Sequence, residues 1–129
     1  MSYTVALFGE AQRGEFRGAY YCKTLDELSD YLGEPPSQDS RGLHYAIQAI
    51  LYQRGVLFFR VHEEGFSMQD YVRGLQFLES EKIPSLSAIC LPGVGNQEII
   101  ERTAPVVEAH SSFLILSDKD LYDFLTYKK

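Results

Sequence analysis

Residues 5–14 read VALFGEAQRG: an apolar run gives way at Gly9 to a polar turn that ends in a second glycine, Gly14. An uninterrupted apolar run is typical of a buried strand, and glycines give the following turn its backbone freedom. Three further runs have the same character and are bounded by turn or cap residues: VLFFRV at 56–61, LSAICL at 86–91 and SFLILS at 112–117. The pattern predicts strands of one sheet packed against helices.

Apolar residues with helical spacing separate these strands. Thr24 and Glu27 have the spacing of a capping box, which predicts a short helix that ends near Gly33. A short strand, AYYC at 19–22, precedes that helix. Further apolar stripes with suitable first residues predict four more helices, which begin near Leu43, Ser67, Asn96 and Asp118.

The predicted order is β, β, α, α, β, α, β, α, β, α. Strands joined through a whole helix pair mainly in parallel, because only a crossover returns the chain in the same direction. The sequence therefore predicts an α/β fold: a three-layer α/β/α sandwich with a mainly parallel, Rossmann-like sheet of four or five strands. At 129 residues, we expect residues 1–129 to form a single domain.

Composition narrows the possible functions. The chain is 45% hydrophobic and 13% aromatic, as expected of a globular domain. It contains no apolar stretch near the roughly 20 residues that span a bilayer, and no basic segment precedes its first apolar run. We therefore expect a soluble cytoplasmic protein without a membrane partner. A net charge of −6, with 12 basic residues scattered among 18 acidic ones, disfavours nucleic-acid binding.

A partial dinucleotide-binding pattern follows the run at 86–91. Gly93 and Gly95 stand in GVGNQE between a predicted strand and a predicted helix. Glu98 replaces the third glycine of the pattern, and its charge would repel a pyrophosphate. A turn with ordinary helix caps is the simpler interpretation. A ligand site at this edge of the sheet would involve Gly9, Glu10, Gly93, Gly95, Asn96 and Asp118.

The remaining polar residues predict no catalytic or metal site. His62, Glu63 and Glu64 are consecutive, so they alternate in direction, and no HExxH or Cys/His set supplements them; we expect a solvated loop. His44 and His110 are isolated, one on a helix surface and one at a helix end, and GxSxG is absent. We expect no catalytic residues, no metal and no cofactor.

The charged turn, the cysteines and the tyrosines complete the list of candidates. We expect the charged residues of the turn at 10–18 to be solvated. Cys22 and Cys90 lie in apolar runs and form no CxxC motif, which indicates buried reduced thiols. Tyrosines half-buried at a surface can anchor a protein partner, although tyrosines at the edge of a core are commoner. The candidates for such contacts are Tyr20, Tyr21, Tyr122 and Tyr127.

The order of these segments resembles the core domain of the contractile phage tail sheath family. The resemblance covers about residues 5–118 and rests on an ordered set: VALFGEAQRG, KTLDELSDYLG, GLHYAIQAILYQRGVLFFRV, FLESEKIPSLSAICLPG and FLILSD. One departure is that Gln53, Arg54 and Gly55 stand where the family has Asn-Gly-Gly before the Arg-Val strand. The resemblance implies an α/β fold and a structural role.

Two functions follow as hypotheses. The first is a non-enzymatic structural or protein-interaction module that self-associates or docks on a larger assembly, with a homo-oligomer expected. Its physical basis is that unpaired edge strands are templates for adding another strand. The alternative is a small nucleotide- or ligand-binding Rossmann-like domain with a possible enzymatic activity.

Overall fold

The computed structural model describes residues 3–81, 83 and 86–126. They form a five-stranded sheet with the order β2-β3-β1-β4-β5. The strands are β1 (Thr4–Gly9), β2 (Ala19–Cys22), β3 (Gly55–Arg60), β4 (Leu86–Cys90) and β5 (Phe113–Ile115). The helices are α1 (Leu25–Leu32), α2 (Gly42–Leu51), α3 (Met68–Ser80), α4 (Gln97–His110) and α5 (Asp118–Thr126). The predicted α/β class and the order of its elements are confirmed.

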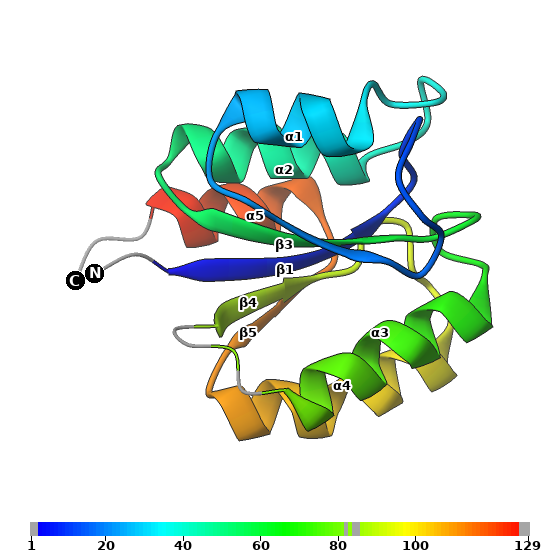
Figure 1. Cartoon of the computed structure of the whole chain (residues 1–129). Coiled ribbons are helices and arrows are strands. Elements are labelled where there is room, and N and C mark those ends of the chain that lie inside the picture. Colours follow the sequence, from blue (N-terminus) through cyan, green and yellow to red (C-terminus); the bar gives the residue numbers. More distant parts are fainter. Residues whose placement is uncertain (1–2, 82, 84–85, 127–129) are drawn as a thin grey trace.

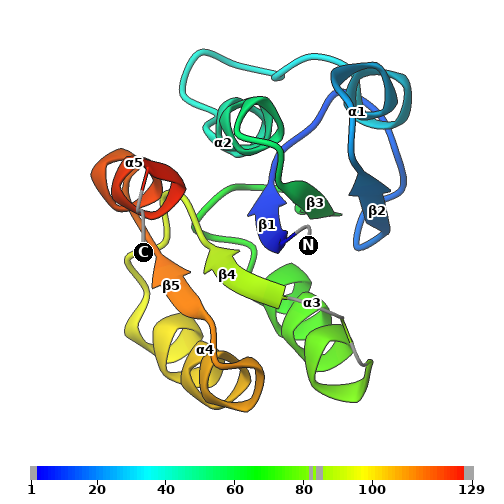
Figure 2. The ribbon, with the colours of Figure 1, turned by 90° about the vertical axis from the view of Figure 1, so that its left-hand side faces the viewer.

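The sheet lies between two layers of helices (Figures 1 and 2). Helices α1, α2 and α5 cover one face, and α3 and α4 cover the other. Strand β1 pairs in parallel with β3 on one side and with β4 on the other, and β4 pairs in parallel with β5. Only β2 is antiparallel to its neighbour, β3. The result is the predicted three-layer arrangement with a mainly parallel sheet.

Strand β1 is the centre of the core because both of its faces are covered. All six of its residues are buried. Val5 and Leu7 belong to the core under α1, α2 and α5, whereas Ala6 and Phe8 belong to the core under α3 and α4. Alternate residues of a strand point to opposite faces, so an uninterrupted apolar run is what a strand between two helical layers requires.

The capping box at the start of α1 is present as predicted. The Glu27 amide donates to Thr24 Oγ1 at 3.1 Å, and the Thr24 amide donates to Glu27 Oε1 at 3.2 Å. Each side chain thereby satisfies a backbone amide that the first helical turn leaves without a partner.

Replacement of Thr24 by alanine tests this cap. We expect Thr24→Ala to lower the free energy of unfolding by about 1 kcal/mol, because one helix amide loses its acceptor. Urea denaturation measures the change. Ser29→Ala in the same helix is the control, since the structure gives the Ser29 hydroxyl no hydrogen bond within the described residues. Equal effects of the two substitutions would contradict a specific role for the cap.

Helix α3 begins at the predicted place, although the Ser67 side chain accepts no hydrogen bond from its first amides. Ser67 directly precedes the helix, and its hydroxyl donates to the Glu63 carbonyl at 3.0 Å instead of accepting from a helix amide. The Asp70 side chain is buried and turns toward the end of β3. Asn96, by contrast, caps α4 as predicted, with its side-chain oxygen accepting from the amide of Glu98 at 2.8 Å.

Within the described part of the chain, no helix combines the length and the apolar character needed to cross a membrane.

Candidate functional site

A ligand site is expected at the edge of the sheet where its parallel strands end. After β1 the chain forms β2 and β3 on one side of it and then β4 and β5 on the other, so the strand order reverses beside β1. In open α/β sheets ligands bind in the crevice at such a point, outside the carboxyl ends of the strands. The candidates Gly9 and Glu10 lie at the end of β1, and Gly93 and Gly95 follow β4.

Two carboxylates close this edge by binding each other's backbone. The amide of Glu10 donates to Glu64 Oε2 at 2.8 Å, and the amide of Glu64 donates to Glu10 Oε2 at 2.9 Å. The other oxygen of the Glu10 carboxylate accepts from the Ser40 hydroxyl at 2.7 Å. The loops after β1 and β3 are therefore tied together by side chains that lie 54 residues apart.

Glu64 also binds the first amides of α2. Its carboxylate accepts from the amides of Arg41 at 2.8 Å and Gly42 at 2.9 Å. Burial raises the pKa of Glu64, and hydrogen bonds from these amides and from the Glu10 amide work in the opposite direction. The prediction of a solvated loop at 62–64 is wrong for Glu64, because its half-buried carboxyl group accepts hydrogen bonds from the backbone at the start of α2, where a helix could otherwise hold a phosphate.

Two glycines allow the close approach that this arrangement requires. A Cβ atom on Gly9 would lie 2.6 Å from the Gly42 Cα atom, so the end of β1 and the start of α2 touch through their backbones. The sequence marked Gly9 as part of a turn. Its partner Gly42 and the acceptor Glu64 were missed because neither belongs to a local motif.

The other candidates for the alternative ligand site engage their own surroundings. Gly93 has a φ of +80° and approaches the Glu64 backbone, whereas a Cβ atom on Gly95 would meet nothing within 4 Å. The Asn96 side chain caps α4. Asp118 is exposed at the start of α5. The pKa of Tyr45 is raised, first by the burial of Tyr45 itself and then by the hydrogen bond and the charge of Asp118. The Glu10 amide and the Asn96 side chain are therefore already hydrogen-bonded within the protein.

A second polar cluster surrounds Asp70 beside the end of β3. Asp70 Oδ1 accepts from Arg17 Nε at 2.6 Å, and Oδ2 accepts from the His62 amide and contacts His62 Nδ1, both at 2.8 Å. Burial alone would raise the pKa of Asp70, but the hydrogen bonds from the backbone and ring of His62 and from Arg17 lower it to about 2. Asp70 therefore remains ionised and fixes two loops against α3.

Phe16 completes this cluster. Its ring stacks on His62, with centroids 3.6 Å apart and planes 11° apart, and the Arg60 guanidinium carbon lies 4.0 Å from its centroid. Arg60 Nη1 also donates to the Gly14 carbonyl. The charged residues of the turn at 10–18 were predicted to be solvated; the Arg17 side chain is 42% exposed, but its Nε atom also donates to the buried Asp70.

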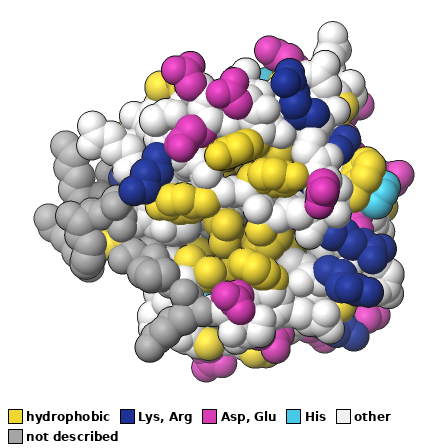
Figure 3. Space-filling view, in the orientation of Figure 1, with side chains coloured by type: hydrophobic (Ala, Val, Ile, Leu, Met, Phe, Trp, Pro, Cys, Tyr) yellow, Lys and Arg dark blue, Asp and Glu magenta, His cyan; other side chains and the backbone are white. Residues whose placement is uncertain are grey.

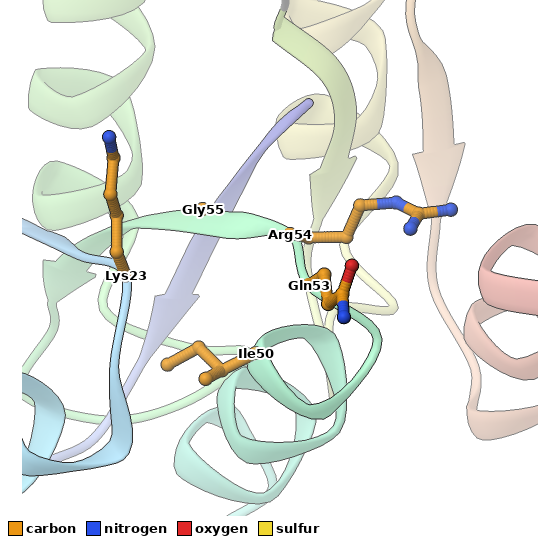
Figure 4. Close-up of a pocket in the computed structure, with 5 residues that line it drawn as sticks. All are labelled: Lys23, Ile50, Gln53, Arg54 and Gly55. Carbon is orange, nitrogen blue, oxygen red and sulfur yellow. The ribbon is translucent and has the colours of Figure 1, made fainter. Parts of the chain in front are cut away.

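A shallow hollow lies at the opposite edge of the sheet, where β3 begins. Figure 4 shows the residues that line it: Lys23, Ile50, Gln53, Arg54 and Gly55. The charged groups of Lys23 and Arg54 point away from each other (Figure 4), so they do not converge on one ligand. This hollow lacks the set of convergent polar groups that marks a small-molecule site.

The tyrosine candidates differ in exposure. Tyr21 is 44% exposed and Tyr122 is 60% exposed. Tyr20 is half-buried, and its hydroxyl accepts from the Glu15 amide at 2.6 Å. Tyr127 lies outside the described residues. Tyr21 and Tyr122 therefore have the exposure that a contact with a partner would use.

The cysteines and histidines add no further cluster. Cys22 and Cys90 are buried free thiols, and burial raises the pKa of Cys22 to about 11. His44 is exposed on α2, and His110 Nε2 lies 3.0 Å from the Leu78 carbonyl oxygen. Among residues 3–81, 83 and 86–126, no group of three His, Cys, Asp or Glu side chains has a geometry that could hold a metal ion.

Comparison of the chain with models of protein families, with characterised proteins and with solved structures found no match.

Proposed function

We propose that this chain is a non-enzymatic structural or protein-interaction module that acts by self-association or by docking on a larger assembly. The ordered motifs that resemble the core domain of a contractile tail sheath subunit motivate the proposal. The observation that carries the proposal is that both edge strands of the sheet are unpaired on their outer side. In the described part of the structure, β2 and β5 each pair with one strand only, and each carries exposed aromatic side chains.

An unpaired edge strand favours contact with another chain because its outward amides and carbonyls lack partners. Tyr21 on β2 is 44% exposed, and Phe113 on β5 is 64% exposed. Aromatic residues are enriched where proteins meet, since they bury much area at little entropic cost.

The edge of the sheet where the parallel strands end also supports the proposal, because backbone amides there are already hydrogen-bonded to side chains of the protein. Glu64 accepts from three backbone amides there, those of Glu10, Arg41 and Gly42. Asn96 accepts from the first amides of α4. An entering phosphate would have to displace these internal acceptors, so this edge favours a closed scaffold over a nucleotide site.

Light scattering coupled to size-exclusion chromatography tests self-association. We expect the molar mass to rise above the 14.7 kDa of one chain as the protein concentration is raised. Docking on a different protein is tested by cross-linking in a cell extract followed by mass spectrometry. A constant monomer mass together with no cross-linked protein would overturn the proposed function.

Nucleotide binding is tested separately by thermal unfolding with ATP, GTP, NAD or NADP. A ligand present at 100 times its dissociation constant would stabilise the protein by about 2.7 kcal/mol, which moves the Tm of a domain of this size by several degrees. We expect no such shift, because internal carboxylates hold the amides that a phosphate would use. A stabilised Tm that Glu64→Gln alters would support the alternative ligand-binding function instead.

A further inference from the structure

The outer edge of β2 has backbone groups available for pairing. The Arg60 amide donates to the Gly18 carbonyl at 3.3 Å, and from there Ala19 pairs with Phe59 and Tyr21 with Leu57. Along an antiparallel pair, residues whose amide and carbonyl point toward the partner strand alternate with residues whose amide and carbonyl point away from it. Since the Gly18 carbonyl points toward β3, the amides and carbonyls of Ala19 and Tyr21 point away from β3. In the described structure no strand pairs with them.

The side chains of this edge form an apolar shelf. Ala19 and Tyr21 pair with Phe59 and Leu57 of β3, which belong to the core under α3 and α4. Residues directly opposite each other on paired strands lie on the same face of the sheet, so Ala19 and Tyr21 also face the α3 side. Phe77 of α3 packs edge-on against Phe59 of β3, and β2 projects beyond that helix (Figure 2). Ala19, Tyr21 and Phe77, which we call the β2–α3 shelf, are all exposed. Figure 3 shows hydrophobic side chains grouped in the middle of this side of the molecule.

Three arginines stand at one end of the shelf. The Arg17 amide donates to the Arg60 carbonyl at 2.9 Å, and Arg17 Nε binds Asp70. Arg73 follows Asp70 by one helical turn and is exposed. Asp70 neutralises Arg17, and the exposed Glu15 lies in the same turn, so this arginine cluster (Arg17, Arg60 and Arg73) keeps an excess of positive charge because its arginines outnumber the two carboxylates. In Figure 3, Lys and Arg side chains gather where β3 ends and α3 begins.

The opposite end of α3 is acidic. Glu79 lies in its last turn, and Glu81 directly follows the helix. Lys23 directly follows β2, and its Nζ atom lies 5.8 Å from the centroid of the Tyr21 ring. The shelf therefore has three arginines near Ala19 and a single lysine at its other end, with the acidic residues farther along α3. The larger number of basic groups near Ala19 favours the direction that places the acidic end of an extended segment there.

We propose that the β2–α3 shelf binds an extended segment of a partner protein, which adds to β2 as an antiparallel strand. Its alternate apolar side chains lie on the shelf, and acidic residues at its carboxyl end meet the arginine cluster. The inference rests on the proposed function as an interaction module and adds the chemistry of the partner. Charge complementarity favours an acidic segment.

A labelled synthetic peptide tests the proposal. The probe is Thr-Val-Thr-Val-Thr-Val-Glu-Glu-Glu, and the control peptide ends in three lysines instead. Fluorescence anisotropy measures the binding of both peptides to the full chain. We expect the acidic peptide to bind at least tenfold more tightly than the basic peptide, and its affinity to fall as salt is raised. Equal binding of the two peptides, or failure of both to bind, would overturn the proposal.

Two pairs of variants locate the binding. Ala19→Pro removes an outward amide that the added strand needs, whereas Ala19→Val keeps it. Arg73→Glu reverses a charge of the arginine cluster, whereas Arg102→Glu makes the same change on α4. We expect Ala19→Pro and Arg73→Glu each to weaken binding of the acidic peptide at least tenfold, and the two controls to change it less than twofold. If Ala19→Pro does not fold, Arg73→Glu alone decides.

The remaining outcomes separate this inference from the proposed function. Self-association that persists while the acidic peptide fails to bind would overturn the inference and leave the module intact. A dimer that Ala19→Pro dissociates would assign the shelf to a second copy and also overturn it. Tight binding of a labelled nine-nucleotide polyuridylate in place of the peptide would overturn both.

Discussion

Gly74→Ala is expected to destabilise the protein by about 2 kcal/mol, although alanine favours a helix over glycine by about 1 kcal/mol. Gly74 is buried in the middle of α3, where a Cβ atom would lie 2.7 Å from Phe8 Cζ and closer still to Cε2. The Phe8 ring has no room to retreat. It stacks between Phe59 at 4.8 Å and Tyr71 at 5.4 Å, measured between centroids.

Urea denaturation measures the effect, and Gly95→Ala is its matched control. A Cβ atom on Gly95 would meet nothing within 4 Å, so we expect this variant to retain the stability of the wild type. A double variant, Gly74→Ala with Phe8→Leu, should lose less stability than the sum of the two single changes, because the smaller side chain makes room. A Gly74→Ala variant more stable than the wild type would show that helix propensity outweighs the clash.

The order of the elements was predictable because each strand and helix carries its own local signal. Strand β1 is buried on both faces and is therefore apolar without interruption, and the capping box at Thr24 marks the start of α1. The predicted boundaries differ from the observed ones by a few residues at most. The run at 112–117, for example, contains the shorter strand Phe113–Ile115. Ladder pairing with the neighbour, more than apolar character, decides where such a strand ends.

The polar clusters were not predictable from the sequence, because their members are far apart along the chain. Glu64 binds the Glu10 amide across 54 residues, and Arg17 binds Asp70 across 53. Local spacing indicated solvated loops for both segments. One signal was available in principle: Asp70 and Gly74 lie one turn apart on a helix face that packs on the sheet, where an acidic residue requires a partner.

Asp70→Asn tests the cluster that joins α3 to the loops after β1 and β3. We expect the free energy of unfolding at pH 7 to fall by about 2 kcal/mol, because the hydrogen bonds to Arg17 and His62 lose the charge of their acceptor. The Arg17 side chain is 42% exposed and keeps part of its hydration, which places the loss below that of a fully buried ion pair. Guanidinium denaturation measures it. Asp123→Asn, which removes an exposed carboxylate paired with Lys119, should cause no measurable change.

The pH dependence of the same variant identifies charge as the cause. Hydrogen bonds lower the pKa of Asp70 from its ordinary 3.8 to about 2, so ionised Asp70 stabilises the folded state above pH 4. This contribution disappears as the pH falls from about 4 to about 2, where the folded protein also takes up the proton. The wild type and Asp70→Asn should therefore differ most at pH 7 and converge near pH 2. An equal difference at both pH values would assign the loss to altered packing around residue 70 and contradict a role for the charge.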